Sequence, residues 1–202
     1  MPAALATADT AERIVAGAEA CLRRFGLRRW SMGDAAAAAG VSRGSVYRYF
    51  ADRDALVDAV LERTAARFVA SSEGAVRRAQ TLTEQVGEAA VFIRTHQRDD
   101  ALTLVLPKDE SLLATLLTVR ADRLVEQFVE FWLPLIEAAR ARGEVRHDLD
   151  ARRASEWIVR VLLSLTLMPS AVIDLDDPDQ VRAFVHDHIV NGLAPSLREE
   201  TA

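Results

Sequence analysis

Apolar residues recur three or four positions apart along most of the chain, which is the spacing of amphipathic helices. In the first segment these positions include Ile14, Ala18, Leu22 and Phe25. They predict a helix over about 10–25, with Thr10 as its N-cap and Gly26 directly after its end. We find no strand-like alternation and no internal repeat, so the pattern predicts an all-α fold of about nine helices.

The N-terminal helices are expected to be short, because turn and cap residues follow one another closely. Ser31 is placed to cap a second helix, "MGDAAAAA", which Gly40 ends. Ser42 is placed to cap a third helix that ends near residue 50. Asp52 is then a suitable N-cap for a fourth helix, which should extend to about residue 72.

Longer helices are expected in the remainder of the chain. The polar segment 73–80 is compatible with a loop or with the polar face of a helix, and a short apolar segment ends at Pro107. Pro134 should kink the longest helix, because proline cannot donate to the carbonyl four residues earlier. Asp177 should cap the last helix, with Pro178 at its first position and Gln180 completing a capping box. The expected ranges are about 81–97, 109–142, 150–168 and 178–191.

The charge is distributed unevenly along the 202 residues. The net charge is −5, which argues against a general nucleic-acid binder. Residues 1–53 nevertheless hold eight arginines and five acidic residues, or +3, and the other 149 residues therefore carry −8. A basic first segment followed by an acidic body suggests that only the first segment meets a polyanion. We therefore predict a first domain over 1–53 that contacts a polyanion and a larger helical domain over 54–202, with the helix over about 53–72 as the connector.

Several classes of protein are disfavoured by what the sequence lacks. The single cysteine, Cys21, excludes an intrachain disulfide framework, and its position on an apolar helix face predicts a core residue. His186 and His188 lie about 200° apart around a helix and cannot chelate one metal together. The acidic run "DLDDPD" has Pro178 and Asp179 where a calcium loop needs other residues. We find no nucleophile elbow or phosphate loop. The expectation is therefore a protein without enzymatic activity, metal or cofactor.

Targeting and membrane signals are also missing from the sequence. The N-terminus lacks a basic region followed by an apolar run, and no stretch reaches 18 apolar residues. We therefore expect a soluble, cytoplasmic protein.

The segment "AAAAAGVSRGSVYRYF", residues 35–50, has the features of a helix-turn-helix. Small alanines allow two helices to cross closely, and Gly40 permits the left-handed backbone of a tight turn. Val46 and Phe50 fall on the inward face of the following helix. Its polar residues are left on the outside, where they can contact phosphates or base edges.

These residues resemble the N-terminal DNA-binding domain of the tetracycline-repressor (TetR) family of bacterial transcription regulators. The resemblance covers residues 10–56 and is carried by "TAERIVAGAEACLRRFG", "WSMGDAAAAAGVSRGSVYRYF" and "ADRDAL". It implies an all-α homodimer whose C-terminal domain binds a small ligand and whose last two helices dimerise.

The sequence departs from the family pattern at two places. The second helix carries "GDAAA" where the family usually has a basic residue and a bulkier aliphatic one, which implies loose packing or a missing phosphate contact. Arg53 replaces a lysine that is common in the family, keeps its charge and can hold a phosphate bidentately.

The candidate DNA-binding residues follow from the motif, with Arg43 expected on bases and Tyr47 on phosphate. The alternative for each is an ordinary solvated helix face or charged loop. The full set is Arg28, Arg29, Ser31, Ser42, Arg43, Gly44, Ser45, Tyr47, Arg48, Tyr49 and Arg53.

The candidate ligand-binding residues rest on weaker grounds, because core packing is the default for an aromatic side chain. A pocket in the C-terminal domain would be built from such residues, and we select Phe92, His96, Phe128 and Trp132. Arg94, Arg120 and Gln127 remain open as the polar anchor.

The last two helices are apolar over a wide arc, and a helix of this kind needs partners on two sides. A second copy of the chain is expected to contact Trp157, Val161, Leu165, Phe184 and His188.

The predicted function is a ligand-responsive repressor that a hydrophobic or amphipathic small molecule releases from a palindromic operator. The alternative is a small-molecule-binding or protein-interaction module of the same fold that has lost specific DNA binding, which the alanine-rich second helix keeps open. The identity of the effector and the operator sequence do not follow from the residues.

Overall fold

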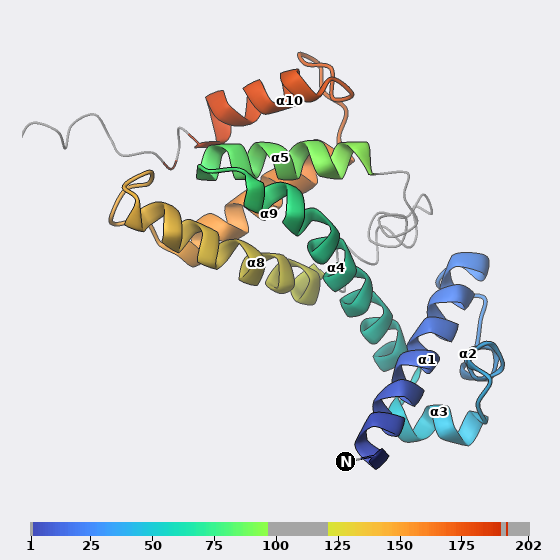
Figure 1. Cartoon of the computed structure of the whole chain (residues 1–202). Helices are drawn as coiled ribbons and strands as arrows, with labels where there is room; N and C mark the ends of the chain where they lie inside the picture. The colour runs from blue at the N-terminus through green and yellow to red at the C-terminus, as the bar shows by residue number, and fades with distance from the viewer. Residues whose placement is uncertain (1, 97–120, 191–192, 194–202) are drawn as a thin grey trace, which may run out of the picture. The chain divides into compact units, whose positions relative to one another are not determined.

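The computed structural model describes residues 2–96, 121–190 and 193 (Figure 1). Within these residues the fold is all-α, as predicted, with eight α-helices, one π-helical turn and no strand. The helices are α1 (Pro2–Phe25), α2 (Met32–Ala39), α3 (Arg43–Tyr49), α4 (Arg53–Arg78), α5 (Leu82–Thr95), α8 (Ala121–Ala141), α9 (Ala151–Leu167), α10 (Pro178–Phe184) and the π-helical turn η1 (Val185–Val190).

The described residues group into two units. Residues up to 65 form the first unit, and residues 66–96 and 122–193 belong to the second. The division falls within α4, which therefore contributes residues to both units. The domain boundary that we placed between residues 53 and 54 stays a prediction.

Two predicted helix ends differ from the structure. The first helix starts at Pro2 instead of after Thr10, because the alanine-rich segment before Thr10 continues the helix. The fourth helix extends to Arg78, six residues past its predicted end. Val76 is fully buried, so residues 73–78 are a helical turn with a polar outer face instead of a loop.

The turn between α2 and α3 is held by backbone hydrogen bonds. Gly40 has a left-handed backbone with φ 65° and ends α2 as predicted. Its N–H donates to the Ala37 carbonyl at 3.2 Å, and the Val41 N–H donates to the Ala36 carbonyl at 3.0 Å. This pair of bonds is the Schellman arrangement, which satisfies the last carbonyls of a helix and reverses the chain.

The alanine-rich helix α2 packs closely against α1. A Cβ atom at Gly17 of α1 would lie 2.8 Å from the Ala39 nitrogen and 2.9 Å from the Ala35 oxygen. Ala35, Ala36 and Ala39 are all buried. The loose packing that the departure from the family pattern implied is therefore wrong, because glycine and alanine bring the two backbones into contact.

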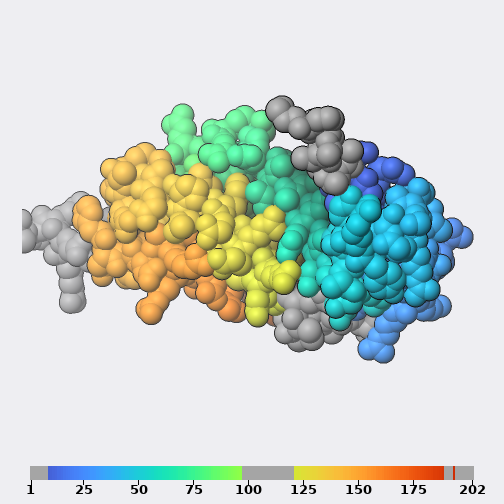
Figure 2. All heavy atoms as spheres, turned by 90° about the horizontal axis from the view of Figure 1, so that it is seen from below, coloured from blue at the N-terminus to red at the C-terminus, as the bar shows by residue number. Residues whose placement is uncertain are grey.

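The second unit contains the last part of α4 together with α5, α8, α9, α10 and η1. Its buried residues form one core cluster that includes Val86, Trp132, Ile136, Ile158 and Val181. Figure 2 shows one face of this unit, where the atoms of α8 and α9 lie side by side. Pro134 lies inside α8, as expected.

The predicted cap Asp177 is confirmed for α10. The structure also shows Thr81 as the N-cap of α5 and Asp150 as the N-cap of α9, each one residue before its helix. The side chain of Gln180 donates to the Asp177 carboxylate and accepts from the Asp174 N–H, so it does not complete the predicted box with the Asp177 backbone. The last helix changes from α to π geometry at Val185. The predictions for 101–107 and 109–120 lie outside the described residues.

No helix in the described part of the chain is both long and apolar enough to cross a membrane.

Candidate functional site

The start of α3 is fixed by its own serines. The Ser42 hydroxyl accepts from the Ser45 N–H at 3.1 Å, and the two hydroxyl oxygens lie 3.0 Å apart. Ser42 is therefore the N-cap, as predicted. Val46 is fully buried and anchors the helix, whereas Phe50 is only half-buried. This anchoring leaves the opposite face of α3 outside the core.

The outer face of α3 carries a preformed pair of DNA-contact candidates. Arg43 and Tyr47 are exposed and lie one helical turn apart. Arg43 Nη2 donates to the Tyr47 hydroxyl at 3.4 Å, and the guanidinium carbon lies 5.5 Å from the ring centroid. The hydrogen bond to Tyr47 raises the pKa of Arg43. The pair can present a fork of N–H donors and a phenolic hydroxyl to one ligand.

The other candidates on α3 differ in exposure. Arg48 is exposed and its guanidinium carbon lies 5.3 Å from the ring centroid of Tyr49, which is half-buried. Ser42 and Gly44 are exposed, and Ser45 is half-buried.

No close packing contact requires a glycine at position 44. A Cβ atom at this position would meet only the Ser42 hydroxyl oxygen, at an ordinary 3.8 Å. The fold of the chain alone therefore does not require glycine here.

The candidates before α2 lie in the turn after α1. Arg28 and Arg29 are exposed. The Ser31 hydroxyl donates to the Asp34 carboxylate at 2.7 Å and accepts from the Asp34 N–H at 3.3 Å. The hydrogen bonds from the Ser31 side chain and backbone lower the pKa of Asp34. Ser31 is thus engaged in the capping box of α2.

Arg53 is turned toward its own unit. Its Nε donates to the Trp30 carbonyl oxygen at 3.2 Å, and its guanidinium carbon lies 4.6 Å from the Trp30 ring centroid. Trp30 is buried.

Arg13 and Arg63, which were not among the predicted site residues, connect helices of the first unit. Arg13 Nη2 donates to the Ala39 carbonyl at 2.8 Å, at the end of α2. Arg63 of α4 pairs with Glu12 at 2.7 Å and also with Glu19, both on α1. Helical spacing cannot reveal such contacts, because the partners are 26 to 51 positions apart in the chain.

Glu19 is the buried member of this group. Burial by itself would raise the pKa of Glu19, but the hydrogen bonds and charges of Arg23 and Arg63 outweigh burial and lower it. Arg23 Nη2 lies 2.8 Å from the carboxylate. Glu19 is therefore a charged link between α1 and α4.

Comparison with known proteins relates the N-terminal helices to a known family. Residues 14–60 match the family model described as bacterial regulatory proteins of the tetR family. Residues 14–60 are therefore a DNA-binding domain of the TetR family of transcriptional regulators. The chain is 25% identical over 185 residues to an uncharacterized HTH-type transcriptional regulator of Mycobacterium tuberculosis, a match that covers 92% of this chain and 94% of the relative.

Solved structures of TetR-family proteins have the same fold. The TetR family repressor AlkX of a Dietzia strain, implicated in biodegradation of n-alkanes, superposes with a TM-score of 0.63 at 23% identity, covering 89% of this chain and 92% of AlkX. The fatty acid degradation regulator FadR of Bacillus halodurans gives a TM-score of 0.61 at 20% identity, covering 93% and 96%.

In the second unit, three of the four ligand-binding candidates have ring contacts with one another or with Phe68 of α4. Phe68 lies 5.7 Å from Phe92 and 6.1 Å from Phe128, between ring centroids. The His96 ring stacks on Phe92 at 4.0 Å. We call Phe68, Phe92, His96 and Phe128 the aromatic cluster. Trp132 instead lies in the core, where it packs edge-on against Phe131 at 5.4 Å.

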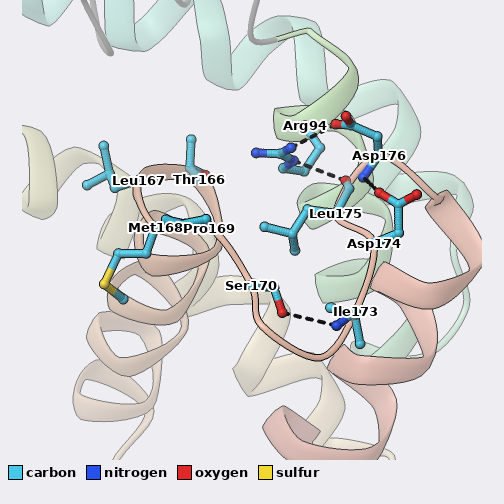
Figure 3. Close-up of a pocket in the computed structure, with 10 residues that line it drawn as sticks. All are labelled: Arg94, Thr166, Leu167, Met168, Pro169, Ser170, Ile173, Asp174, Leu175 and Asp176. Atoms are coloured by element: carbon cyan, nitrogen blue, oxygen red, sulfur yellow. Dashed lines mark hydrogen bonds and ion pairs between the residues drawn. The ribbon is translucent and has the colours of Figure 1, made fainter.

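Arg94, one of the three polar anchors left open, lies in a different place from the aromatic cluster. It lines an open hollow of about 390 Å³ together with residues of the connection between α9 and α10. Figure 3 labels these residues. Arg94 Nη2 pairs with Asp176 at 2.8 Å, and its Nε donates to the Leu175 carbonyl at 3.1 Å. Arg120 lies outside the described residues, and Gln127 is half-buried on α8.

The dimer candidates share one stripe of α9. Trp157 is 37% exposed, and Val161 and Leu165 follow it at four-residue intervals, both half-buried. Met168 and Val172, which follow the helix end, are also exposed, at 60% and 81%. On α10 and η1, Phe184 is half-buried and stacks on the exposed His188 at 4.8 Å. Within the described residues, no three potential ligand side chains converge on a metal site.

Proposed function

We propose that this TetR-family regulator is a ligand-responsive repressor that binds a palindromic operator as a homodimer. The observation that carries the proposal is the outer face of α3, where Arg43, Tyr47 and Arg48 are exposed while Val46 anchors the helix in the core. Exposed donors on a short capped helix match what a recognition helix needs in the major groove.

Within this proposal the exposed residues divide into two roles. Arg43 contacts base edges, where its forked donors suit the two acceptors of a guanine. Tyr47 contacts phosphate, together with Arg48, Arg28 and Arg29, and these contacts supply affinity without sequence preference. Gly44 allows the backbone of α3 to approach the groove wall.

The homodimer places two such helices on one face of the duplex. Successive major grooves are about 34 Å apart, so the two recognition helices must match this spacing or a multiple of it. The stripe of Trp157, Val161 and Leu165, with Phe184 and His188, is the proposed contact between the two copies. One exposed and two half-buried apolar side chains at four-residue intervals along one helix support an interface with another protein.

The effector is a hydrophobic or amphipathic small molecule that binds at the aromatic cluster. AlkX is implicated in biodegradation of n-alkanes and FadR regulates fatty acid degradation, and both have this fold, which supports this class of molecule.

Helix α4 offers the route by which the effector alters DNA binding. Phe68 of the aromatic cluster and Arg63, which pairs with Glu12 and Glu19 of α1, are five residues apart on this one helix. That separation is about 7.5 Å along the helix axis. A ligand that favours another tilt of α4 therefore changes the spacing of the two recognition helices and releases the operator.

The decisive experiment is a mobility shift with DNA from the region upstream of the protein's own gene. Wild type is compared with Tyr47→Ala at several salt concentrations, and Arg153→Ala, an exposed change on α9, is the matched control. We expect Tyr47→Ala to weaken binding and the control to leave it unchanged. Equal binding by wild type and Tyr47→Ala would reject the role of α3 and favour a module that has lost specific DNA binding.

The effector is tested separately by native mass spectrometry of freshly purified protein. We expect a co-purified apolar molecule whose retention falls in Phe92→Ala. Retention that is unaffected by Phe92→Ala would remove the aromatic cluster from the proposal.

A further inference from the structure

Arg53 is the one candidate DNA contact whose guanidinium faces the interior of the first unit. It is the first residue of α4, and Trp30 is the residue directly before Ser31, the N-cap of α2. The 3.2 Å hydrogen bond to the Trp30 carbonyl and the 4.6 Å stack on its ring use both the edge and the face of the guanidinium. The side chain therefore joins the beginnings of two helices that are 21 residues apart in the chain.

The burial of one guanidinium nitrogen and the engagement of the Nε and of the guanidinium face with Trp30 argue against a contact with the DNA backbone. Arg53 Nη2 is buried and has no hydrogen-bond partner among the described residues. A phosphate oxygen has to come within about 3 Å of such a nitrogen. That approach would require the guanidinium to leave the Trp30 ring, and the ring would lose the cation that covers it.

We propose that Arg53 is a positioning residue for the helix-turn-helix and does not bind phosphate. It holds the start of α2 against the start of α4, so that α2 and α3 keep a fixed orientation relative to the first turn of α4. The inference rests on the proposed DNA-binding function for its consequence, but the link between Arg53 and Trp30 can be tested without DNA.

Arginine suits this role better than lysine does. A guanidinium is planar, stacks on an aromatic face and still donates from Nε in the ring plane. The lysine ammonium is a compact, strongly hydrated charge that can satisfy a phosphate but cannot make both of these contacts. The two roles therefore predict opposite behaviour for Arg53→Lys.

The test measures affinity against salt concentration for wild type, Arg53→Lys and Arg53→Gln, using a duplex that the wild-type full-length protein selects from random sequence. We expect both variants to bind about tenfold more weakly, which corresponds to the loss of one stacked cation contact. The slope of log K against log salt should stay at the wild-type value in both. Arg153→Gln, which removes an exposed charge on α9, is the control.

A phosphate contact would give a different pattern. Arg53→Lys would then bind almost as well as wild type, and Arg53→Gln would reduce the salt slope by about 0.9. Either result overturns the proposal. Circular dichroism at the assay temperature ensures that the compared proteins are equally folded.

A double-mutant cycle in urea unfolding tests the link itself, with Arg53→Lys, Trp30→Phe and the double variant. We expect the two changes to be non-additive, because each removes part of the same contact. Additive effects would overturn the proposal even if the salt slopes were unchanged. If wild type selects no duplex, the proposed function fails, and this cycle still decides whether Arg53 acts through Trp30.

Discussion

The helix-turn-helix and the second unit are both built from amphipathic helices, yet they differ in how directly their residues indicate function. On α3 the polar residues Arg43, Tyr47 and Arg48 are exposed, and the buried Val46 packs the opposite side of the helix into the core. In the second unit the candidate residues are aromatic and aliphatic, and core packing accounts for them equally well. Trp132 illustrates this, because it is 3% exposed and belongs to the core cluster.

This difference has a physical cause. Exposed donors cost little and have no reason to gather in the fold itself, so their arrangement points to a ligand. Apolar residues must be buried in any case, and burial against a ligand, a second copy or the core uses the same side chains. The exposure of an apolar side chain in the structure indicates whether the core already accounts for it. Trp157 is exposed and Val161 is half-buried on α9, so the core does not fully account for them.

The largest expected effect is a loss of DNA affinity when the apolar stripe of α9 is disrupted. It would show that this stripe matters as much for DNA binding as the polar face of α3. Trp157→Glu places a charge in the proposed contact between two copies, and we expect a monomer by analytical ultracentrifugation. Loss of the second half-site contact should lower the apparent DNA affinity by about 10²–10⁴-fold. Arg153→Glu, on the same helix outside the stripe, should remain dimeric. A dimeric Trp157→Glu would remove the stripe from the interface.

The close crossing of α1 and α2 is the next test, because it concerns apolar packing inside the DNA-binding unit. Gly17→Ala adds a Cβ atom within 3 Å of two backbone atoms of α2, and we expect unfolding free energy to fall by about 1–3 kcal/mol. Gly74→Ala is the matched change in α4, where the Cβ would lie 3.7 Å from Arg78. It should be neutral or stabilising in urea unfolding. Equal effects of the two substitutions would contradict the close crossing.

The buried charge at Glu19 should make stability depend on pH. Its pKa is lowered in the fold below the ordinary 4.5, so its contribution is present above that value and is lost as pH falls through the folded pKa. We expect Glu19→Gln to reduce unfolding free energy by about 1–2 kcal/mol at pH 7 and by less near pH 3.

Glu73→Gln provides the control for Glu19, because its carboxylate pairs with Arg77 on the surface of α4. Exposed pairs of this kind contribute roughly 0–1 kcal/mol. Unfolding curves of both variants at pH 7 and pH 3 test whether the charge of Glu19 stabilises the fold. A Glu19→Gln loss that does not change with pH would show that its charge is not the cause.

The smallest expected change in stability is at Gly44, and it tests most directly whether α3 is shaped for a ligand or for its own fold. Gly44→Ala should stabilise α3 by roughly 0.5–1 kcal/mol, since alanine is the better helix former and its Cβ has room. DNA affinity should nevertheless fall several-fold, because the added methyl group separates α3 from the groove. Thermal unfolding and the mobility shift together measure the two opposite changes. Unchanged DNA binding would remove the proposed reason for glycine at this position.

Local rules predicted the local features well. Ser31, Ser42 and Gly40 cap or end their helices as expected, since capping and a left-handed turn depend on a few neighbouring residues. The start of α1 and the end of α4 were wrong by several residues, because polar and alanine-rich segments can extend a helix when tertiary packing supports it. Phe68, whose ring contacts both Phe92 and Phe128, was not among the predicted site residues.

The sequence by itself determined the helical fold class, the caps and turns of the helix-turn-helix, and the residues that α3 leaves outside its core, because these follow from spacing along one segment. Only the tertiary structure decided which distant residues meet. It turned Arg53 onto Trp30, joined Glu19 to Arg63, and separated Trp132 from the aromatic cluster. Such contacts depend on how helices pack in space. The hydrophobic period of one helix shows which face is buried but not which residues of another helix that face will contact.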